Sequence, residues 1–405
     1  MVENQFLERL NLLFQYVLKN KLPFGGKQVI FLGDFHQLPP VKAFEHCLQC
    51  GESIPVRLEL VCVSQKCKGR EDHQTFQKGD KWAFRAPVWR ELKLRHVKLE
   101  QIHRQKDTRF QDILNKIRNG HPLSAQEWAD LERPKQLPRS AHAVRLMSKL
   151  AKVKAFNENE LAALKSQPKT WRAFDSCKKL IPQDYYDPVT ALKMQEYKES
   201  LKEHRFPVDL TLKVGSQVVL LHNMDHERGL VNGSQGVVIG FQKATQELEK
   251  ILDQSGDHQA FRHDSMLQYH TSNIEWRPLV RFANGSVELI PAIATAAFRG
   301  PGDPLQQYTV CRTQVPLTLA WALSIHKSQG MTLEYVEVSS RDIFESGQLY
   351  VALSRATHLE GLRVTGLSRN QLPMDPTVLE FYTSTKWEKL QPRGRKKVTA
   401  NLITC

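Results

Sequence analysis

Four consecutive apolar residues, Val29-Ile30-Phe31-Leu32, lead directly into the loop GDFHQLPP at residues 33–40. A short run that is apolar on both faces is typical of a central strand in a parallel sheet, because helices cover both sides of such a sheet. Ligand-binding loops leave these sheets at the carboxyl ends of the strands. The sequence therefore predicts an α/β fold in which residues 33–40 take part in the chemistry.

The segments around this run have the periods of helices and strands. Residues 143–147, 335–338 and 362–365 are predicted strands, and residues 348–355 and a segment from Leu319 onward are predicted to be helical. Two amphipathic helices are predicted from apolar residues that recur at helical spacing. In residues 2–18 these are Val2, Phe6, Leu10, Leu13, Phe14 and Val17, and in the second helix they are Phe110, Ile113, Leu114 and Ile117.

Residues 208–318 have a different pattern. Short apolar segments such as 218–221, 231–241 and 279–282 are joined by Asn-Gly turns, which favour β-hairpins. We expect a small β module here, inserted into an α/β domain. Residues 164–206 are charged and poor in aliphatic side chains, so we expect a loop-rich excursion there.

The charge balance of the chain is strongly basic. Its 405 residues include 57 Lys and Arg against 43 Asp and Glu, which gives a net charge of +14. Such a balance indicates a polyanionic partner such as nucleic acid, or simply a basic protein. No window approaches the roughly 18 consecutive apolar residues of a membrane span, and the N-terminus has no basic region and cleavage site typical of a signal peptide.

Four of the seven cysteines lie within a polar segment, residues 44–80. Cys47 and Cys50 are separated by two residues, and Cys62 and Cys67 by four. The first spacing is that of a zinc knuckle, and the second is wider than usual. We favour a structural Zn²⁺ held by these four thiolates over the alternative, a set of reduced thiols in a loop.

Two segments carry residues suited to sensing a phosphoryl group. Gln37, at the end of the predicted central strand, could donate to a γ-phosphate or orient a water. Arg104, within Gln101-Ile102-His103-Arg104-Gln105, could stabilise charge on a transferring phosphoryl group. The plainer alternatives are an ordinary strand-to-loop turn and a solvated surface arginine.

Two further segments lie near the C-terminus. Residues 324–332, SIHKSQGMT, combine hydroxyls, an amide, a cation and a glycine, a set suited to gripping a nucleic-acid backbone. Residues 348–357, QLYVALSRAT, form a predicted helix from which Arg355 could reach a ligand. Taken alone, the first could be a helix-capping loop and the second an amphipathic helix.

The four segments, in this order, resemble motifs III, IV, V and VI of superfamily-one DNA helicases of the Pif (petite integration frequency) type. Residues 23–28, PFGGKQ, precede the first motif as in that family, and residues 212–240 resemble the start of its small 2B module. The resemblance covers most of the chain, apart from residues 164–206, 242–275 and the tail.

The resemblance implies a fold and domain limits. We expect RecA-like parallel sheets of the P-loop NTPase type, with the first domain incomplete, and a small SH3-like β-rich insertion. The expected domains are a remnant of domain 1A at 1–125 with the insertion 44–80, domain 2A at 126–207 and 319–385, the 2B module at 208–318, and a basic disordered tail at 386–405.

The resemblance also implies an activity, an ATP-driven motor that moves 5′ to 3′ on single-stranded DNA and unwinds forked duplexes. The expected γ-phosphate sensors are Gln37 and Arg104, with Arg355 as the arginine finger, and all three are expected to meet in one triphosphate slot. Gly33, Asp34 and Gly330 complete the expected nucleotide site, with Mg²⁺ accompanying ATP. The expected DNA contacts are His326, Lys327, Ser328, Gln329 and Thr332.

The chain departs from the family in one respect. The 405 residues contain no glycine-rich string ending in Gly-Lys-Ser/Thr, nor the acidic pair that binds Mg²⁺. We expect that the sequence starts just after these motifs and that this chain alone hydrolyses ATP negligibly, because the transition-state charge would go uncompensated.

Family membership further implies work in repair, recombination and telomere maintenance, in the nucleus or mitochondrion, by a monomer with no membrane partner. Two alternatives remain open. One is a non-catalytic DNA-binding scaffold, and the other is the helicase part of a rolling-circle transposon.

Overall fold

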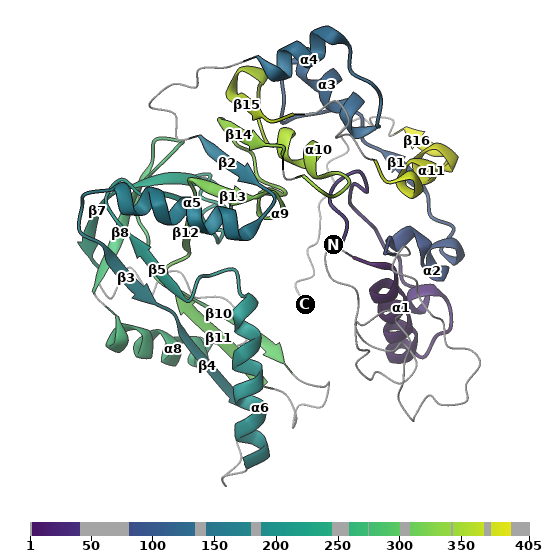
Figure 1. Cartoon of the computed structure of the whole chain (residues 1–405). Helices are drawn as coiled ribbons and strands as arrows, with labels where there is room; N and C mark the ends of the chain where they lie inside the picture. Colours follow the sequence, from purple (N-terminus) through teal and green to yellow (C-terminus); the bar gives the residue numbers. More distant parts are fainter. Residues whose placement is uncertain are drawn as a thin grey trace. The chain divides into compact units, whose positions relative to one another are not determined.

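The computed structural model describes residues 2–40, 81–133, 143–179, 188–244, 259–273, 275–299, 308–341, 343–367 and 374–389 (Figure 1). Its contacts group into two compact units. Unit 1 comprises residues 1–130, 343–354 and 368–405, and unit 2 comprises residues 131–342 and 355–367. The domain limits expected from the sequence differ from these groupings and stay a prediction.

Unit 1 begins with helix α1 (Asn4–Leu18), the short helices η1 (Pro23–Gly26) and η3 (Ala83–Arg85), and helix α2 (Pro87–Glu91). Two polar side chains of α1 accept hydrogen bonds from backbone N–H groups of η1 and α2. Asn11 accepts a hydrogen bond from the backbone N–H of Phe24 at 2.8 Å, and Glu8 accepts one from Val88 at 2.6 Å. The buried core of this part consists of Leu7, Phe24, Ala83, Ala86 and Val88.

Residues 27–33 are extended but form no strand, and within the described residues they pair with no other strand. Val29 and Phe31 pack against the core beneath α1, whereas Ile30 and Leu32 are 76% and 90% exposed. The prediction of a strand buried on both faces is therefore wrong for this structure. The reason is physical: the described chain supplies neither the strands nor the helices that would cover the outer face.

The rest of unit 1 is organised around aromatic side chains. Strand β1 (His96–Lys98) pairs in parallel with β16 (Trp387–Lys389). Helix α11 (Pro376–Ser384) precedes β16 in the sequence, and its Phe381 ring packs against His96 and Trp387 of the two strands. Phe381 of α11 stacks on Phe84 at 4.3 Å between ring centroids, and the Trp82 indole donates to Asp375 at 2.9 Å. Residues 374–389 therefore belong to the aromatic core of unit 1.

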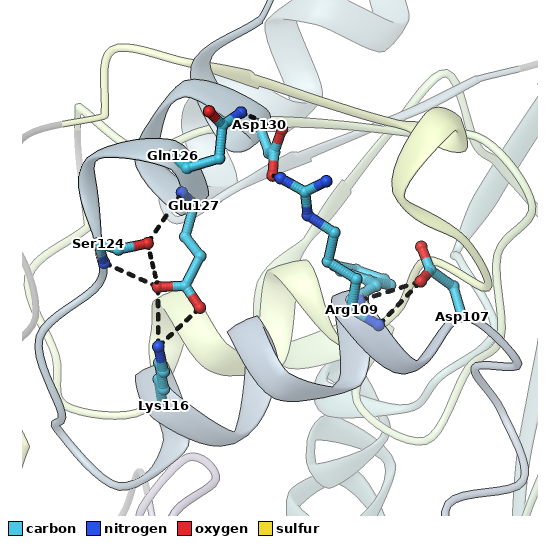
Figure 2. A network of polar contacts seen from close by, with 8 residues as sticks. Asp107, Arg109, Lys116, Ser124, Gln126, Glu127 and Asp130 are labelled. Carbon is cyan, nitrogen blue, oxygen red and sulfur yellow. Dashed lines mark hydrogen bonds and ion pairs between the residues drawn. The ribbon is translucent and has the colours of Figure 1, made fainter.

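Helix α3 (Thr108–Arg118) confirms the second predicted amphipathic helix, because Phe110, Ile113, Leu114 and Ile117 are all buried. Helix α4 (Ala125–Glu132) follows it. Figure 2 shows how a polar network joins the two helices. Glu127 accepts hydrogen bonds from the backbone N–H and hydroxyl of Ser124, and both of its oxygens accept from Lys116 of α3. Ser124 and Glu127 thus form a capping box.

Unit 2 contains a four-stranded parallel sheet with the order β13-β2-β14-β15. The strands are β13 (Ala322–Ser324), β2 (Val144–Met147), β14 (Val336–Ser339) and β15 (Leu362–Thr365). Helix α5 (Leu150–Ala163) is tied to β13 by Asn157, whose side chain exchanges two hydrogen bonds with the backbone of Ala322. The parallel sheet confirms the α/β prediction and three of the predicted strands.

The remaining strands of unit 2 are antiparallel. A five-stranded sheet has the order β12-β6-β7-β8-β9, a three-stranded sheet the order β10-β11-β4, and β3 pairs with β5. The bounds are β3 (Lys169–Arg172), β4 (Phe174–Lys179), β5 (Asp209–Leu212), β6 (Gln217–Leu220), β7 (Gln235–Lys243), β8 (Trp276–Phe282), β9 (Val287–Leu289), β10 (Ile293–Arg299), β11 (Tyr308–Gln314) and β12 (Leu317–Leu319). Helices α6 (Pro188–Glu199), η4 (Ser200–Glu203) and α8 (Gln259–Ser272) accompany them.

These sheets confirm the short strands predicted between residues 208 and 318. Two expectations for the neighbouring segments are wrong. Residues 164–206 are not loop-rich, since they contain β3, β4 and α6. The segment from Leu319 is not helical but continues into strand β13, and its only helix within the described residues is the single turn at Ile325–Ser328. Side-chain burial explains the first error: Trp171 is fully buried in the β core although its neighbours in sequence are charged.

In the described part of the chain, no helix has the length and apolarity needed to traverse a bilayer.

Candidate functional site

In unit 1, the loop that contains Gln37 is held by a carboxylate. Asp34 receives two hydrogen bonds from the Arg118 guanidinium, at 2.8 Å and 3.3 Å. The Gln37 side-chain amide donates to the second oxygen of Asp34 at 3.3 Å, and the Tyr382 hydroxyl donates to the first, also at 3.3 Å. The same hydroxyl accepts from the backbone N–H of Phe35 at 3.2 Å. The loop, α3 and α11 thus share one polar network.

Burial and charge shift the pKa values in this network. Burial alone would raise the pKa of Asp34, but the charge and hydrogen bonds of Arg118 outweigh burial and hold it below its ordinary value. Burial and the nearby Arg118 cation lower the pKa of His36 to about 4. Burial, together with the Asp34 charge, raises the pKa of Tyr382 to about 12. At neutral pH the network is therefore a charged Asp34–Arg118 pair beside a neutral imidazole and a neutral phenol.

The short helix α10 (Gln348–Leu353) contacts this loop at its beginning. Gly347, the residue before the helix, has a φ of +79°, and a Cβ atom on it would lie 2.7 Å from the carbonyl oxygens of both His36 and Gln37. Only glycine combines this conformation with this close approach. The sequence pattern gave no signal for this contact.

At the other end of α10, the carbonyl oxygen of Ser354 accepts hydrogen bonds from two neighbouring side chains. Arg104 donates to it from Nη1 at 3.3 Å, and Gln105 from Nε2 at 3.0 Å. Gln37 and Arg104 are thus both connected to α10 within unit 1, one at each end. Gly33, by contrast, is exposed, and a Cβ on it would contact nothing within 4 Å.

In unit 2, residues 324–332 begin at the carboxyl end of strand β13. The Ser324 hydroxyl accepts from the backbone N–H of Lys327 at 3.2 Å, which caps the helical turn α9 (Ile325–Ser328). Ser328 is fully buried and donates to the carbonyl oxygen of Ile325, so its hydroxyl is used inside the turn. Lys327 and Thr332 are exposed, and His326 and Gln329 are partly buried.

Arg355 lies against the same segment. Its side chain is 1% exposed, and Nη1 donates to the carbonyl oxygen of Met331 at 3.3 Å. The backbone N–H of Leu333 donates to the carbonyl oxygen of Arg355 at 3.0 Å, so the two segments also join through the main chain. Gly330, with a φ of +86°, supplies the turn that brings them together.

The predicted residues therefore fall into two groups, each described within its own unit. Gln37, Asp34 and Arg104 lie in unit 1, and Arg355 lies with residues 324–332 in unit 2. The expectation that Gln37, Arg104 and Arg355 share one slot stays a prediction. Sequence reasoning missed the supporting residues Arg118, Gln105, Gly347 and Tyr382. Gln105 lay within a motif already singled out, whereas Tyr382 lies over 340 positions from Asp34 along the chain.

The four cysteines proposed to bind zinc, Cys47, Cys50, Cys62 and Cys67, lie outside the described residues. Among the residues that are described, no group of three or more His, Cys, Asp or Glu side chains could hold a metal ion. The structure therefore offers no support for the zinc prediction.

Comparison with known proteins gives two family matches. Residues 1–48 match the PIF1-like helicase family, and residues 196–241 match the DNA helicase Pif1 2B domain. The ATP-dependent DNA helicase PIF1 of Danio rerio is 33% identical over 400 residues, covering 96% of this chain and 48% of the relative. The Homo sapiens protein of the same name is 31% identical over 396 residues, covering 95% and 48%. The chain thus spans about half the length of the curated relatives it matches.

Solved structures agree with the fold. The crystal structure of Pif1 helicase from Candida albicans has a TM-score of 0.67 and 29% sequence identity, covering 95% of this chain and 74% of that one. A Bacteroides Pif1 in complex with ADP-AlF3 and single-stranded DNA has a TM-score of 0.54 and 22% identity, covering 95% and 73%. At that identity the second match supports the fold alone.

Proposed function

Because the chain belongs to the Pif1-like helicase family, we propose that it is part of an ATP-dependent 5′ to 3′ DNA helicase. In this proposal residues 324–332 grip single-stranded DNA, and Gln37, Arg104 and Arg355 respond to the nucleotide. Gly33, Asp34 and Gly330 contribute backbone or orientation at the nucleotide, which would bring its own Mg²⁺.

One observation carries the proposal, the contact between Arg355 and the segment 324–332. The arginine expected to respond to nucleotide is bonded to the carbonyl oxygen of Met331, inside the segment expected to hold DNA. A movement of the Arg355 guanidinium would therefore be transmitted to residues 324–332 through a direct hydrogen bond. Coupling between the nucleotide phosphate and the DNA strand requires a structural element that both ligands act on. In this proposal the Arg355–Met331 contact is that element.

Lys327 is the best-placed group in this segment to bind a DNA phosphate. It is exposed at the end of a capped turn, and its cation could neutralise one phosphate and release counterions. We predict that Lys327→Ala weakens binding of a single-stranded oligonucleotide and lowers the salt dependence of log K by about 0.7, the value for one phosphate contact. Fluorescence anisotropy across a range of salt concentrations measures both.

The matched control is Lys193→Ala, which removes an exposed lysine of helix α6 without touching residues 324–332. It should leave the affinity nearly unchanged. Equal losses from the two substitutions would mean that the chain binds DNA only through its overall charge, and the grip proposal would fail.

ATP hydrolysis by these 405 residues alone should be negligible. They contain no Gly-Lys-Ser/Thr string, so nothing in the sequence supplies the lysine and backbone cradle that neutralise the β- and γ-phosphates. A steady-state ATPase assay with saturating single-stranded DNA tests this. Turnover in the ordinary enzyme range of about 1–1000 per second would contradict the expectation.

The same missing string favours a second candidate, a DNA-binding protein without motor activity. The two candidates differ in whether nucleotide changes DNA affinity. For the helicase part we expect ATP to alter it once a phosphate loop is present, whereas the scaffold would bind DNA identically with and without nucleotide.

We further propose that the helicase acts in repair, recombination and telomere maintenance, in the nucleus or the mitochondrion, and that it works as a monomer on single-stranded and forked DNA. The support for these roles is the resemblance to the family, whose matched relatives are named ATP-dependent DNA helicase PIF1. Comparing helicase-dependent telomere length and mitochondrial DNA content after loss of the gene would test them.

A further inference from the structure

The loop that connects strands β6 and β7, residues 221–234, is held by hydrogen bonds of its own. The backbone N–H of Gly233 donates to the carbonyl oxygen of Leu220 at 2.8 Å. The Ser234 hydroxyl donates to the carbonyl oxygen of Gly229 at 2.9 Å. Both bonds lie within the hairpin, so the β module itself fixes the conformation of this loop.

Gly233 packs directly against a residue of the segment 324–332. A Cβ atom on Gly233 would lie 3.1 Å from Cγ of Met331 and 3.8 Å from both its Cβ and its Sδ. Gly233 also has a φ of +98°, so glycine is the residue that suits both the backbone conformation and the close approach. A larger side chain at this position would push the Met331 side chain aside.

Met331 is held through its backbone as well as through its side chain. Its N–H donates to the carbonyl oxygen of Ser328 at 3.0 Å, and its carbonyl oxygen accepts from Nη1 of Arg355 at 3.3 Å. The side-chain contact with Gly233 comes from the β module instead. Met331 therefore joins the loop of the β module to the segment expected to hold DNA and to the arginine expected to respond to nucleotide.

We propose that Gly233 is a positioning residue for DNA binding. In this proposal the loop 221–234 holds Met331, and with it the segment 324–332, in the conformation that accepts single-stranded DNA. The inference rests on the proposed function, which assigns the DNA grip to that segment. The loop lies within residues 196–241, which match the Pif1 2B domain. The β module would thus set DNA affinity through packing, without a charged contact to the strand.

Gly233→Ala should weaken the binding of a fluorescent oligothymidine to the 405-residue chain roughly fivefold, measured by anisotropy. The salt dependence of log K should stay unchanged, because no cation that contacts a phosphate is lost. Gly229→Ala is the matched control in the same loop. Gly229 has a φ of +72°, but a Cβ on it would meet only the Asn284 side-chain nitrogen, at 3.7 Å. This control should leave the affinity nearly unchanged.

Met331→Ala separates the packing contact from general damage to the fold, because it removes the side chain that Gly233 touches. Alone it should weaken oligothymidine binding by a similar factor, and adding Gly233→Ala should then cause little further loss. In methyl NMR of the methionine-labelled chain, the Met331 signal is identified by its absence from Met331→Ala. That signal should shift in Gly233→Ala and stay in place in Gly229→Ala.

Equal losses of affinity from Gly233→Ala and Gly229→Ala would overturn the proposal. So would an unchanged affinity in Gly233→Ala, or an equal loss with and without the Met331 side chain. Circular dichroism checks that each variant folds. If Gly233→Ala does not fold, unchanged oligothymidine binding by Met331→Ala would overturn the proposal in its place.

Lys327→Ala distinguishes this inference from the proposed function. If Lys327→Ala weakens oligothymidine binding and Gly233→Ala does not, the positioning role fails and the DNA grip stands. If neither substitution changes the affinity, the grip by residues 324–332 fails and the positioning role fails with it.

Discussion

His36 lies in an unusual environment for a histidine. Its side chain is 1% exposed, its ring stacks on that of Tyr382 with centroids 4.1 Å apart, and among the described residues neither ring nitrogen has a hydrogen-bond partner. Arg118 lies on the same network and repels any added proton. The imidazole therefore packs as a neutral aromatic ring in the loop that positions Gln37.

This environment predicts a dependence of stability on pH. The folded pKa of about 4 lies below the ordinary value of 6.5, so between these values the unfolded chain binds more protons. The contribution of His36 should be complete above pH 6.5 and be lost as the pH falls towards 4, by up to about 3 kcal/mol. His36→Phe keeps the stacked ring but cannot be protonated. The unfolding free energy of this variant should therefore change less between pH 6.5 and pH 4 than that of the original chain. An unchanged pH slope in the variant would contradict the account.

At the scale of elements, two connections hold the site in place. The capping box of Ser124 and Glu127 fixes the start of α4 and, through Lys116, its contact with α3 (Figure 2). Hydrogen bonds from Lys116 and Ser124 lower the pKa of Glu127 to about 2. Since α3 also carries Arg118, the helix pair supports the network around Asp34.

Glu127→Ala should destabilise the fold by about 1 kcal/mol, the typical loss for a capping side chain. Because the folded pKa of Glu127 is depressed, its contribution is present above about pH 4.5 and should be lost as the pH falls towards 2. Urea denaturation at pH 7 and pH 3 measures the change. Glu196→Ala, at an exposed position of α6, is the control, and an equal effect from both substitutions would remove the capping explanation.

The second connection is the contact between Gly347 and the carbonyl oxygens of the Gln37 loop. Gly347→Ala should cost about 3 kcal/mol, because it adds a clash to the strain of a positive φ. Gly285→Ala, at a φ of +86° with no atom near the added Cβ, tests strain alone and should cost about 1 kcal/mol. Thermal unfolding measures the stability of both variants. Equal losses of stability from Gly347→Ala and Gly285→Ala would show that the close approach at Gly347 contributes nothing.

At the scale of the whole molecule, three of the four strands of the parallel sheet of unit 2 were predictable, because in β2, β14 and β15 apolar residues alternate with polar or less buried ones. The motif segments could be located as local strings, whereas the roles expected of Arg355 and residues 324–332 stay predictions. Strand β3 was not predictable, since its one buried residue, Trp171, stands among charged neighbours. Helical spacing also could not tell which side of α1 faces the core, because buried Glu8 and Asn11 decide it through hydrogen bonds.

The hydrogen-bond network around Asp34 could likewise be predicted only in part from the sequence. The carboxylate was identified from its place after an apolar run, but Arg118 and Tyr382 reach it from distant segments. Long-range pairs of this kind leave no period or spacing in a sequence. Only packing brings them together.

Crosslinking of DNA to the chain tests the central claim most directly. A single-stranded oligonucleotide with photoreactive bases, irradiated on the 405-residue chain and mapped by mass spectrometry, should attach within or beside residues 324–332, and Lys327→Ala should reduce that attachment. Crosslinks confined to other parts of the chain, unaffected by Lys327→Ala, would contradict the claim that this segment holds the strand.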